Sequence, residues 1–219
     1  MGRSKDAEKT KNLILQTAST IMMDVGYENM TIKNILDETG LSKGALYHHF
    51  KSKDEIIDAL WDFELDENDK DLDFINSSKN GKEKLYNIFL YLFSDEEKIH
   101  RDTVTKGLLK NPRHFIKYFK STFETGAIKI ENIIIEGNED GSLNVIETKQ
   151  AAEIVAMMLN FWINPLLSAT SNEDYLKRIN VFIKVMKSLG LDIFDDKITS
   201  LANKFASKYY ENIDSANIK

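Results

Sequence analysis

The chain contains no cysteine, and this absence excludes several kinds of site at once. Disulfide bonds, zinc sites built from thiolates and cysteine nucleophiles all depend on that residue. Proline and glycine are also scarce, with 2 and 10 occurrences in 219 residues. Because these two residues interrupt helices, their scarcity favours a helix-rich protein. Hydrophobic residues make up 42% of the chain, which is enough to build a sizeable core.

Long hydrophobic runs are missing too. The longest uninterrupted apolar run, Ile154 to Leu159, is far shorter than the roughly 20 residues that a membrane helix needs. The start of the chain is too polar for a signal peptide, and Asp6 stands where an N-myristoylation motif requires Ser or Thr. We therefore expect a soluble, cytoplasmic protein without a membrane partner.

The formal net charge is −6, because 35 acidic residues outnumber 29 basic ones. A protein that binds nucleic acid through its whole surface is usually basic, so the total argues against a nonspecific binder. The charge is uneven along the chain: Met1 to Leu60 carries 8 basic and 9 acidic residues, a net charge of −1. No acidic residue occurs between Thr39 and Lys53. This strip leaves room for a local site that contacts phosphate groups.

Apolar residues at three- and four-residue steps, together with capping residues, predict closely spaced helices in the first sixty residues. Thr31 and Ser42 are suited to cap two short helices, and Gly40 lies where the chain turns between them. Ser52 to Glu55 forms a capping box that starts the next helix. The expected helices span residues 7–25, 32–39, 43–50 and a fourth from about 53 onward. A helix, a sharp turn and a second short helix are typical of a helix-turn-helix.

Beyond residue 76 every pattern is helical as well, and no strand alternation occurs, so the fold class is all-α. The polar, turn-rich stretch Asn76 to Gly81 indicates a domain boundary. Gly137 is expected to end a long helix that starts at Pro112. The remaining helices are expected at residues 85–93, 148–168, 174–189 and 196–210. The predicted organisation is a helix-turn-helix domain at 1–54, a connecting helix at 55–75 and a second helical domain at 76–219.

The stretch from Met30 to Ile57 resembles the DNA-binding signature of the TetR/AcrR transcriptional regulators. The resemblance lies in Thr31-Ile32, Gly40-Leu41-Ser42-Lys43-Gly44, Leu46-Tyr47-His48, Phe50 and Lys51-Ser52-Lys53-Asp54-Glu55. It implies a three-helix DNA-binding domain followed by a helical domain that binds a small effector and forms a homodimer. It also implies a regulator, typically a repressor, that leaves its DNA operator when the effector binds.

The same resemblance assigns roles to individual residues. Ser42, Lys43, Gly44 and Ala45 would lie against the bases in the major groove. Phosphate contacts would come from Thr31, Tyr47, His48 and Lys53, and Lys51 adds positive charge beside them. The hydroxyl and imidazole of Tyr47 and His48 are donors that phosphate oxygens accept. Leu46 and Phe50 are expected to pack in the domain core instead.

An effector pocket in the second domain is expected from the aromatic residues there, although at helical spacing such residues are also typical of plain core. Phe and Met walls would suit a small apolar or amphipathic molecule. The candidate lining residues are Phe89, Phe93, His100, Phe115, Phe119, Phe123, Met158 and Trp162. The helices expected at 148–168 and 174–189 are apolar nearly all round. Paired across a two-fold axis they would form a dimer interface, which predicts a pseudo-palindromic operator.

Other functions find less support in the sequence. No motif of a known catalytic site or cofactor-binding loop occurs, so we expect neither an enzyme nor a bound cofactor. The main alternative is a helical ligand- or calcium-binding module, because Glu136 to Glu147 places oxygen ligands at spacings similar to an EF-hand loop. Its first position is Glu, however, where the motif requires Asp. Control by a partner protein instead of a small molecule is a further alternative.

Overall fold

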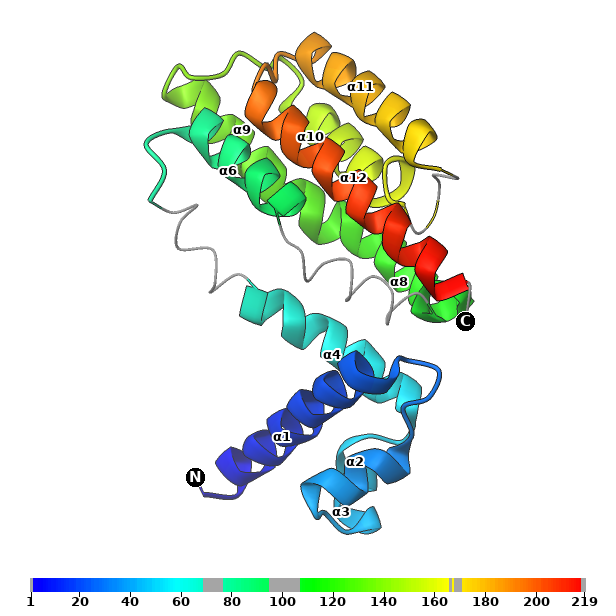
Figure 1. The fold of residues 1–219 in the computed structure, drawn as a ribbon. Helices are drawn as coiled ribbons and strands as arrows, with labels where there is room; N and C mark the ends of the chain where they lie inside the picture. The colour runs from blue at the N-terminus through cyan, green and yellow to red at the C-terminus, as the bar shows by residue number, and fades with distance from the viewer. Residues whose placement is uncertain (1, 69–76, 95–106, 166, 168–170, 218–219) are drawn as a thin grey trace. The chain divides into compact units, whose positions relative to one another are not determined.

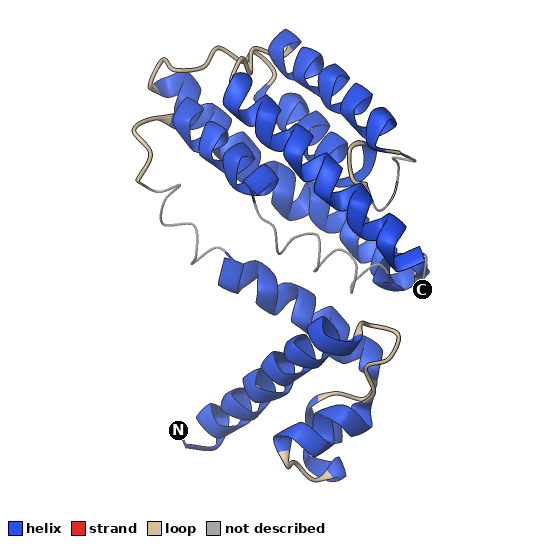
Figure 2. Ribbon diagram, in the orientation of Figure 1, coloured by secondary structure: helices blue, strands red, loops and turns tan. Residues whose placement is uncertain are grey.

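The computed structural model describes residues 2–68, 77–94, 107–165, 167 and 171–217. These residues form helices joined by loops and turns, and Figure 2 shows no strand among them. The all-α prediction is therefore confirmed for the described part of the chain. Within that part, no helix is both long and apolar enough to cross a membrane. The chain divides into two compact units, which are described separately below.

The first unit contains four helices: α1 (Gly2–Val25), α2 (Ile32–Thr39), α3 (Lys43–His49) and α4 (Lys53–Asn68). Figure 1 shows α1 crossing α4, with the short α2 and α3 lying next to each other. The described residues 107–115 also belong to this unit, although they follow the second unit's first helix in the sequence. The domain boundaries predicted at residues 54 and 75 assign residues 107–115 to the second domain, whereas in the structure these residues belong to the first unit.

The helix starts of the first unit follow the capping pattern in the sequence. Thr31 caps α2, with its hydroxyl accepting from the Asn34 backbone N–H at 3.2 Å. Ser42 caps α3 in the same way, accepting from the Ala45 N–H at 3.2 Å. Between them, Gly40 adopts a left-handed conformation with φ of +67°, which a residue with a side chain rarely adopts. The helix-turn-helix is thus specified by local signals.

Leu46 and Phe50 are buried, as the sequence predicts, and belong to the core of the first unit. That core also takes in Leu108 from the returning segment. The other buried members are Ile14, Leu15, Ala18, Met22, Met30, Ile35, Ile56, Ile57 and Leu60. Because these side chains come from α1, α2, α3 and α4 together, the core holds α3 at a set angle to the rest of the unit.

The second unit is a helical bundle. It contains α6 (Gly81–Ser94), α9 (Ile128–Glu139), α10 (Thr148–Met157), α11 (Asn172–Ser188) and α12 (Asp196–Asn217). Helix α8 (Pro112–Ser121) begins in the first unit and continues into the second. Two π-helical turns, η1 (Thr122–Ala127) and η2 (Met158–Trp162), extend α8 and α10 without a break. Figure 1 shows α6, α9, α10 and α12 lying beside one another.

Several expected helix ends differ from the structure. Gly137 does not end a helix, because α9 continues to Glu139 and the turn follows at Gly141, where φ is +77°. Gly137 is instead a point of close approach: a Cβ atom there would lie 2.5 Å from the Leu143 side chain. The helix expected to reach Ser168 ends at Trp162. The last helix extends past Tyr210 to Asn217.

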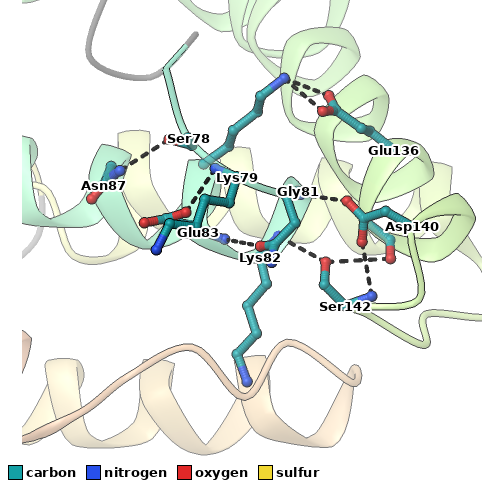
Figure 3. A network of polar contacts seen from close by, with 12 residues as sticks. Ser78, Lys79, Gly81, Lys82, Glu83, Asn87, Glu136, Asp140 and Ser142 are labelled. Carbon is teal, nitrogen blue, oxygen red and sulfur yellow. Dashed lines mark hydrogen bonds and ion pairs between the residues drawn. The ribbon is translucent and has the colours of Figure 1, made fainter.

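The loop that resembles a calcium site holds the start of α6 instead (Figure 3). Asp140 accepts hydrogen bonds from the backbone N–H groups of Gly81 and Ser142, each at 2.8 Å. Glu136 accepts both of its 2.7 Å hydrogen bonds from the Lys84 ammonium. No group of three or more His, Asp or Glu residues in the described ranges could hold a metal ion. The described contacts therefore give this loop a structural role at the start of α6.

Candidate nucleic-acid interface

One face of α3 is exposed and free of acidic residues. Ser42, Lys43, Gly44, Tyr47 and His48 are all exposed there, and the Tyr47 side chain retains 40% of its accessible surface. The half-buried Ala45 lies between them in the sequence, and the exposed Lys51 follows the helix. The structure thus brings these residues, which the sequence singles out, to one surface. Such a face, with donors and positive charge, can contact phosphate and base edges.

Gly44 is unusual because nothing inside the protein requires a glycine there. A Cβ atom would meet only the Ser42 hydroxyl oxygen, at 4.0 Å, so there is space for a side chain. Gly44 is also not among the glycines with positive φ. Glycine within a helix costs stability relative to alanine, by about 0.5–1 kcal/mol. Because Gly44 lowers helix stability and is not required by the packing of the protein, its presence is consistent with close approach of a binding partner to this surface.

Thr31 already uses its hydroxyl group within the protein. The hydroxyl donates to the Asn34 side-chain oxygen at 2.5 Å, and the Thr31 backbone N–H donates to the same oxygen at 3.0 Å. Together with the bond from the Asn34 N–H, these contacts form a reciprocal cap on α2. A phosphate contact by the Thr31 hydroxyl would have to replace its bond to Asn34, a competition that the sequence did not indicate.

Lys53 is drawn toward the turn between α1 and α2. Its ammonium donates to the Tyr27 carbonyl oxygen and lies 4.2 Å from the centre of the Tyr27 ring. Burial lowers the pKa of Lys53 from its ordinary value, while the nearby charges of Asp54 and Glu28 act in the opposite direction. Because Lys53 and Tyr27 are 26 residues apart, no local pattern reveals this contact. A phosphate contact by Lys53 would have to compete with Tyr27.

Tyr47, His48 and Lys51 are all exposed residues. The Lys43 ammonium lies 5.8 Å from the centre of the Tyr47 ring, one helical turn away. The rings of His48 and His49 meet edge to face at 5.3 Å. Two histidines at the end of α3 also suit the negative end of the helix dipole. The Lys51 backbone N–H donates to Glu55, and Lys51 is exposed.

The aromatic residues expected to line one pocket fall into separate groups. Phe89 and Phe93 are buried in the core of the second unit, as is Met158, and Trp162 packs against that core. The ring of Phe89 lies 4.8 Å from that of Phe194. Phe119 and Phe123 lie elsewhere on the bundle, with Phe119 at 5.5 Å from Phe161 and 47% exposed. Phe115 belongs to the first unit, and His100 lies outside the described residues.

Beside Phe119 lies a polar cluster that was not expected from the sequence, formed by Tyr118, Thr122, Asn160 and Asn164. The Tyr118 hydroxyl donates to the Asn160 carbonyl oxygen at 3.1 Å and accepts from the Asn164 amide at 3.4 Å. The Asn160 amide donates to the Thr122 hydroxyl at 3.0 Å, and Thr122 is only 2% exposed. The bond between Asn160 and Thr122 joins the π-helical turns η1 and η2, and such turns occur frequently at functional sites.

Comparison with known proteins gives this geometry a context. The family described as "Bacterial regulatory proteins, tetR family" matches residues 14–60, which include α2 and α3. The transcriptional repressor KstR2 of Mycobacterium tuberculosis is 33% identical over 97 residues, 42% of this chain and 46% of that protein. The chain therefore matches about half the length of this relative. The transcriptional regulator PksA of Bacillus subtilis is 25% identical over 82% of this chain and 90% of its own length.

A solved structure shares the fold over nearly the whole chain. It is a transcriptional regulator from Cytophaga hutchinsonii, with a TM-score of 0.58. The alignment covers 92% of this chain and 96% of that one, at 18% sequence identity. At this identity the likeness concerns the fold alone. The order of a helix-turn-helix unit and a helical second unit is thus shared with a known regulator structure.

Proposed function

We propose that this chain, which belongs to the TetR family of bacterial regulatory proteins, is a DNA-binding regulator of transcription. The observation that carries the proposal is the exposed, acid-free face of α3, where Gly44 serves no internal purpose. A family of regulators also fits the absence of catalytic motifs from the sequence. Because its partner is chromosomal DNA, we place the protein in the cytoplasm.

The proposed contacts with DNA are of two kinds, contacts with bases and contacts with phosphate groups. Side chains at the start of α3 meet the bases, while the phosphate contacts surround them. The base contacts are Ser42, Lys43, Gly44 and Ala45, and the phosphate contacts are Thr31, Tyr47, His48, Lys51 and Lys53. The internal bonds of Thr31 and Lys53 make these two the weakest members of the set. Lys43, Tyr47 and Lys51 carry the interaction most directly, because their side chains are exposed.

We further propose that the protein is a repressor that acts as a homodimer. Relatives such as KstR2 are named as repressors, and regulators of this kind bind pairs of half-sites. The expected interface is formed by α10 and α11, which expose Met157 and Val181. The exposed side of α11 also carries Lys177 and Lys184, so this interface combines apolar contacts with charges. Two α3 helices about 34 Å apart, or a multiple of that, would read a pseudo-palindrome.

The effector site is proposed near η1 and η2. Phe119, Phe123 and Phe161 supply an apolar wall, and the polar cluster of Tyr118, Thr122, Asn160 and Asn164 can orient a polar group. A small amphipathic molecule would suit both parts. Release from DNA then requires that the effector binds better to the conformation that cannot engage the operator.

Selection of bound DNA from a random library tests the main proposal. We expect enrichment of one pseudo-palindromic sequence, bound with a shift in gel mobility that Lys43→Ala weakens. Lys82→Ala, at an exposed position of α6 in the second unit and outside the proposed dimer interface, is the matched control and should leave DNA binding unchanged. No enrichment, or equal binding of all sequences, would contradict the proposal. Light scattering at micromolar concentration separates the dimer from a monomer.

The effector is tested by fluorescence of Trp162 in a Trp61→Phe background, so that the remaining tryptophan reports. Trp162 lies in η2, and the Arg178 guanidinium lies 5.4 Å from the centre of its ring. We expect quenching by those compounds of a hydrophobic panel that also release DNA. Compounds that release DNA without changing the Trp162 signal would place the effector site elsewhere.

A further inference from the structure

The four residues proposed to face the bases, Ser42 to Ala45, offer hydrogen-bond donors rather than acceptors. Lys43 ends in an ammonium group, which can only donate. Gly44 and Ala45 carry no polar side-chain atom. The Ser42 hydroxyl oxygen already accepts from the Ala45 backbone N–H at 3.2 Å, while its own proton stays available to a partner. A base edge that meets this surface therefore meets donors.

Side chains that could accept from a base are missing from this stretch of the chain. No Asp, Glu, Asn or Gln occurs among residues 39–53. The amide that precedes the stretch in the sequence is Asn34 of α2, and its side-chain oxygen is already in use. It accepts from the Thr31 backbone N–H at 3.0 Å and from the Thr31 hydroxyl at 2.5 Å. The cap of α2 thus occupies the one amide that lies close in the sequence.

The remaining acceptors nearby belong to groups with other places in the proposed complex. Asp37 and Glu38 are exposed on α2. In a helix-turn-helix this first helix crosses the DNA backbone, while the second helix enters the major groove. Tyr47 and His48 also carry acceptor atoms, and both are among the proposed phosphate contacts. Base reading is thereby left to the donors at residues 42 and 43.

The Lys43 ammonium is not held by the protein. Among the described residues it makes no hydrogen bond or ion pair, and its described contact is with the Tyr47 ring, whose centre lies 5.8 Å away. This distance is near the outer limit of a cation–π interaction, so the ammonium can leave the ring at little cost. Lys53, by contrast, donates to the Tyr27 carbonyl oxygen. Of these two lysines, Lys43 is the one whose donors are available to a base.

Each base presents a different edge in the major groove. Guanine offers two acceptors, N7 and O6, and a lysine or arginine on these two atoms is the commonest specific contact. Adenine places a donor beside its acceptor and is matched by Asn or Gln, whereas the cytosine donor is matched by Asp or Glu. Thymine offers O4 alone, beside its methyl group. A lysine without any amide or carboxylate beside it therefore fits guanine best.

We infer that Lys43 donates to N7 and O6 of a guanine in each half-site of the operator and so determines which base stands at that position. The inference rests on the proposed function and names the base that its operator must contain. Gly44 has no side chain that would keep the base edge away from α3. The Lys43 ammonium also stays within the field of the flanking phosphates, so it still contributes to the salt dependence of binding.

The test uses the full-length protein and the DNA sequence selected from the library, in which we expect a guanine common to both half-sites. That guanine is replaced in one half-site by 7-deazaguanine, which lacks N7. We expect affinity, measured by fluorescence anisotropy, to fall by about fivefold or more. Inosine is the matched control, because it keeps N7 and O6 and differs from guanine only in the minor groove. It should leave affinity nearly unchanged.

Two lysine variants show which side chain reads the guanine. Lys43→Ala should bind more weakly and should bind the guanine and 7-deazaguanine duplexes equally, because the donor that distinguishes them is gone. Lys51→Ala removes an exposed lysine that lies outside α3, so it should also bind more weakly but keep the difference between the two duplexes. Both are measured at about 0.05 M salt, where weak binding is strengthened.

A third variant changes the base that is read. Lys43→Gln offers a donor and an acceptor, so selection from the library should replace the guanine by adenine. A Lys43→Ala protein that keeps the wild-type preference for guanine over 7-deazaguanine overturns the inference. A selected half-site without guanine, or one in which 7-deazaguanine is tolerated at every guanine, does the same. Failure to select any DNA overturns the proposed function instead.

Discussion

Gly40 and Gly44 lie four residues apart in the helix-turn-helix and are used for different physical reasons. A Cβ atom would have open space at both positions. Gly40 is required by its backbone, because φ is +67° there, whereas Gly44 lies in α3 and has no positive φ. From the sequence alone, both glycines belong to one motif and their roles cannot be told apart. The backbone conformation shows that only the first has a role within the folded chain.

Substitution of these glycines by alanine should therefore have opposite effects on stability. Gly44→Ala should raise the free energy of unfolding by about 0.5–1 kcal/mol, since alanine is the better helix former. Gly40→Ala should lower it by about 1 kcal/mol, because alanine is strained at positive φ. Urea unfolding measures both. In a gel-shift titration Gly44→Ala should bind DNA more weakly despite its greater stability, and unchanged binding would remove Gly44 from the interface.

The lysines at positions 43 and 53 differ in what their ammonium groups contact. Lys43 is exposed, while Lys53 is held by Tyr27. The dependence of DNA affinity on salt counts the phosphates that are neutralised. We expect Lys43→Ala to reduce the slope of log affinity against log salt by about one per subunit, and Lys53→Met to reduce it less. Equal reductions would mean that Lys53 leaves Tyr27 when DNA binds.

At the scale of elements, the close approach of α6 to α9 depends on the glycine at position 81. A Cβ atom on Gly81 would lie 2.4 Å from the Gly137 backbone nitrogen and 2.7 Å from the Ile133 carbonyl oxygen. These are backbone atoms, so neither helix can relieve the overlap by a change of rotamer. Gly137, which the sequence predicts to end a helix, lies instead within α9, where its small size leaves room for the Leu143 side chain.

Gly81→Ala should accordingly lower the free energy of unfolding by about 1–3 kcal/mol, the usual cost of overpacking. Gly126→Ala is the matched control, because its nearest contact would be the Ser121 carbonyl oxygen at an ordinary 3.8 Å. Thermal and urea unfolding should show a loss for the first variant and none for the second. Similar stabilities of the two variants would argue against a close crossing of α6 and α9.

The start of α6 also predicts a dependence of stability on pH. The hydroxyl group of Ser142 and the backbone N–H of Gly81 hold the pKa of Asp140 below its ordinary value. The stabilising effect of this carboxylate is therefore present above the unfolded-state pKa and is lost as the pH falls through the lower folded-state pKa. Asp140→Asn should melt below the wild type at neutral pH, and the gap should close below about pH 4. A gap that stays constant in acid would contradict this.

At the scale of the whole molecule, the net charge of −6 coexists with an acid-free strip between Thr39 and Lys53. Net repulsion between the protein and DNA should keep nonspecific binding weak, while the strip supplies the phosphate contacts. If Lys43 and Lys51 of both subunits neutralise four phosphates, raising the salt from about 0.05 to about 0.2 M should lower affinity about a hundredfold. Fluorescence anisotropy with labelled DNA measures this, and an affinity insensitive to salt would exclude the phosphate contacts.

The sequence by itself determined the features that depend on neighbouring residues. The caps at Thr31 and Ser42, the turn at Gly40 and the burial of Leu46 and Phe50 follow from local hydrogen bonding and helical spacing. For the same reason the sequence indicated which residues share the exposed face of α3, although their contacts with DNA stay predictions. These features need no information from distant parts of the chain.

Only the tertiary structure decided the contacts between residues far apart in the sequence. The pairing of Lys53 with Tyr27, the partition of the aromatic residues between core and surface, and the place of His114 between two carboxylates of α4 belong to this class. Side-chain spacing along a helix shows which residues share a face, but not which other element covers that face. That choice follows from the packing of the whole chain, and it returned residues 107–115 to the first unit.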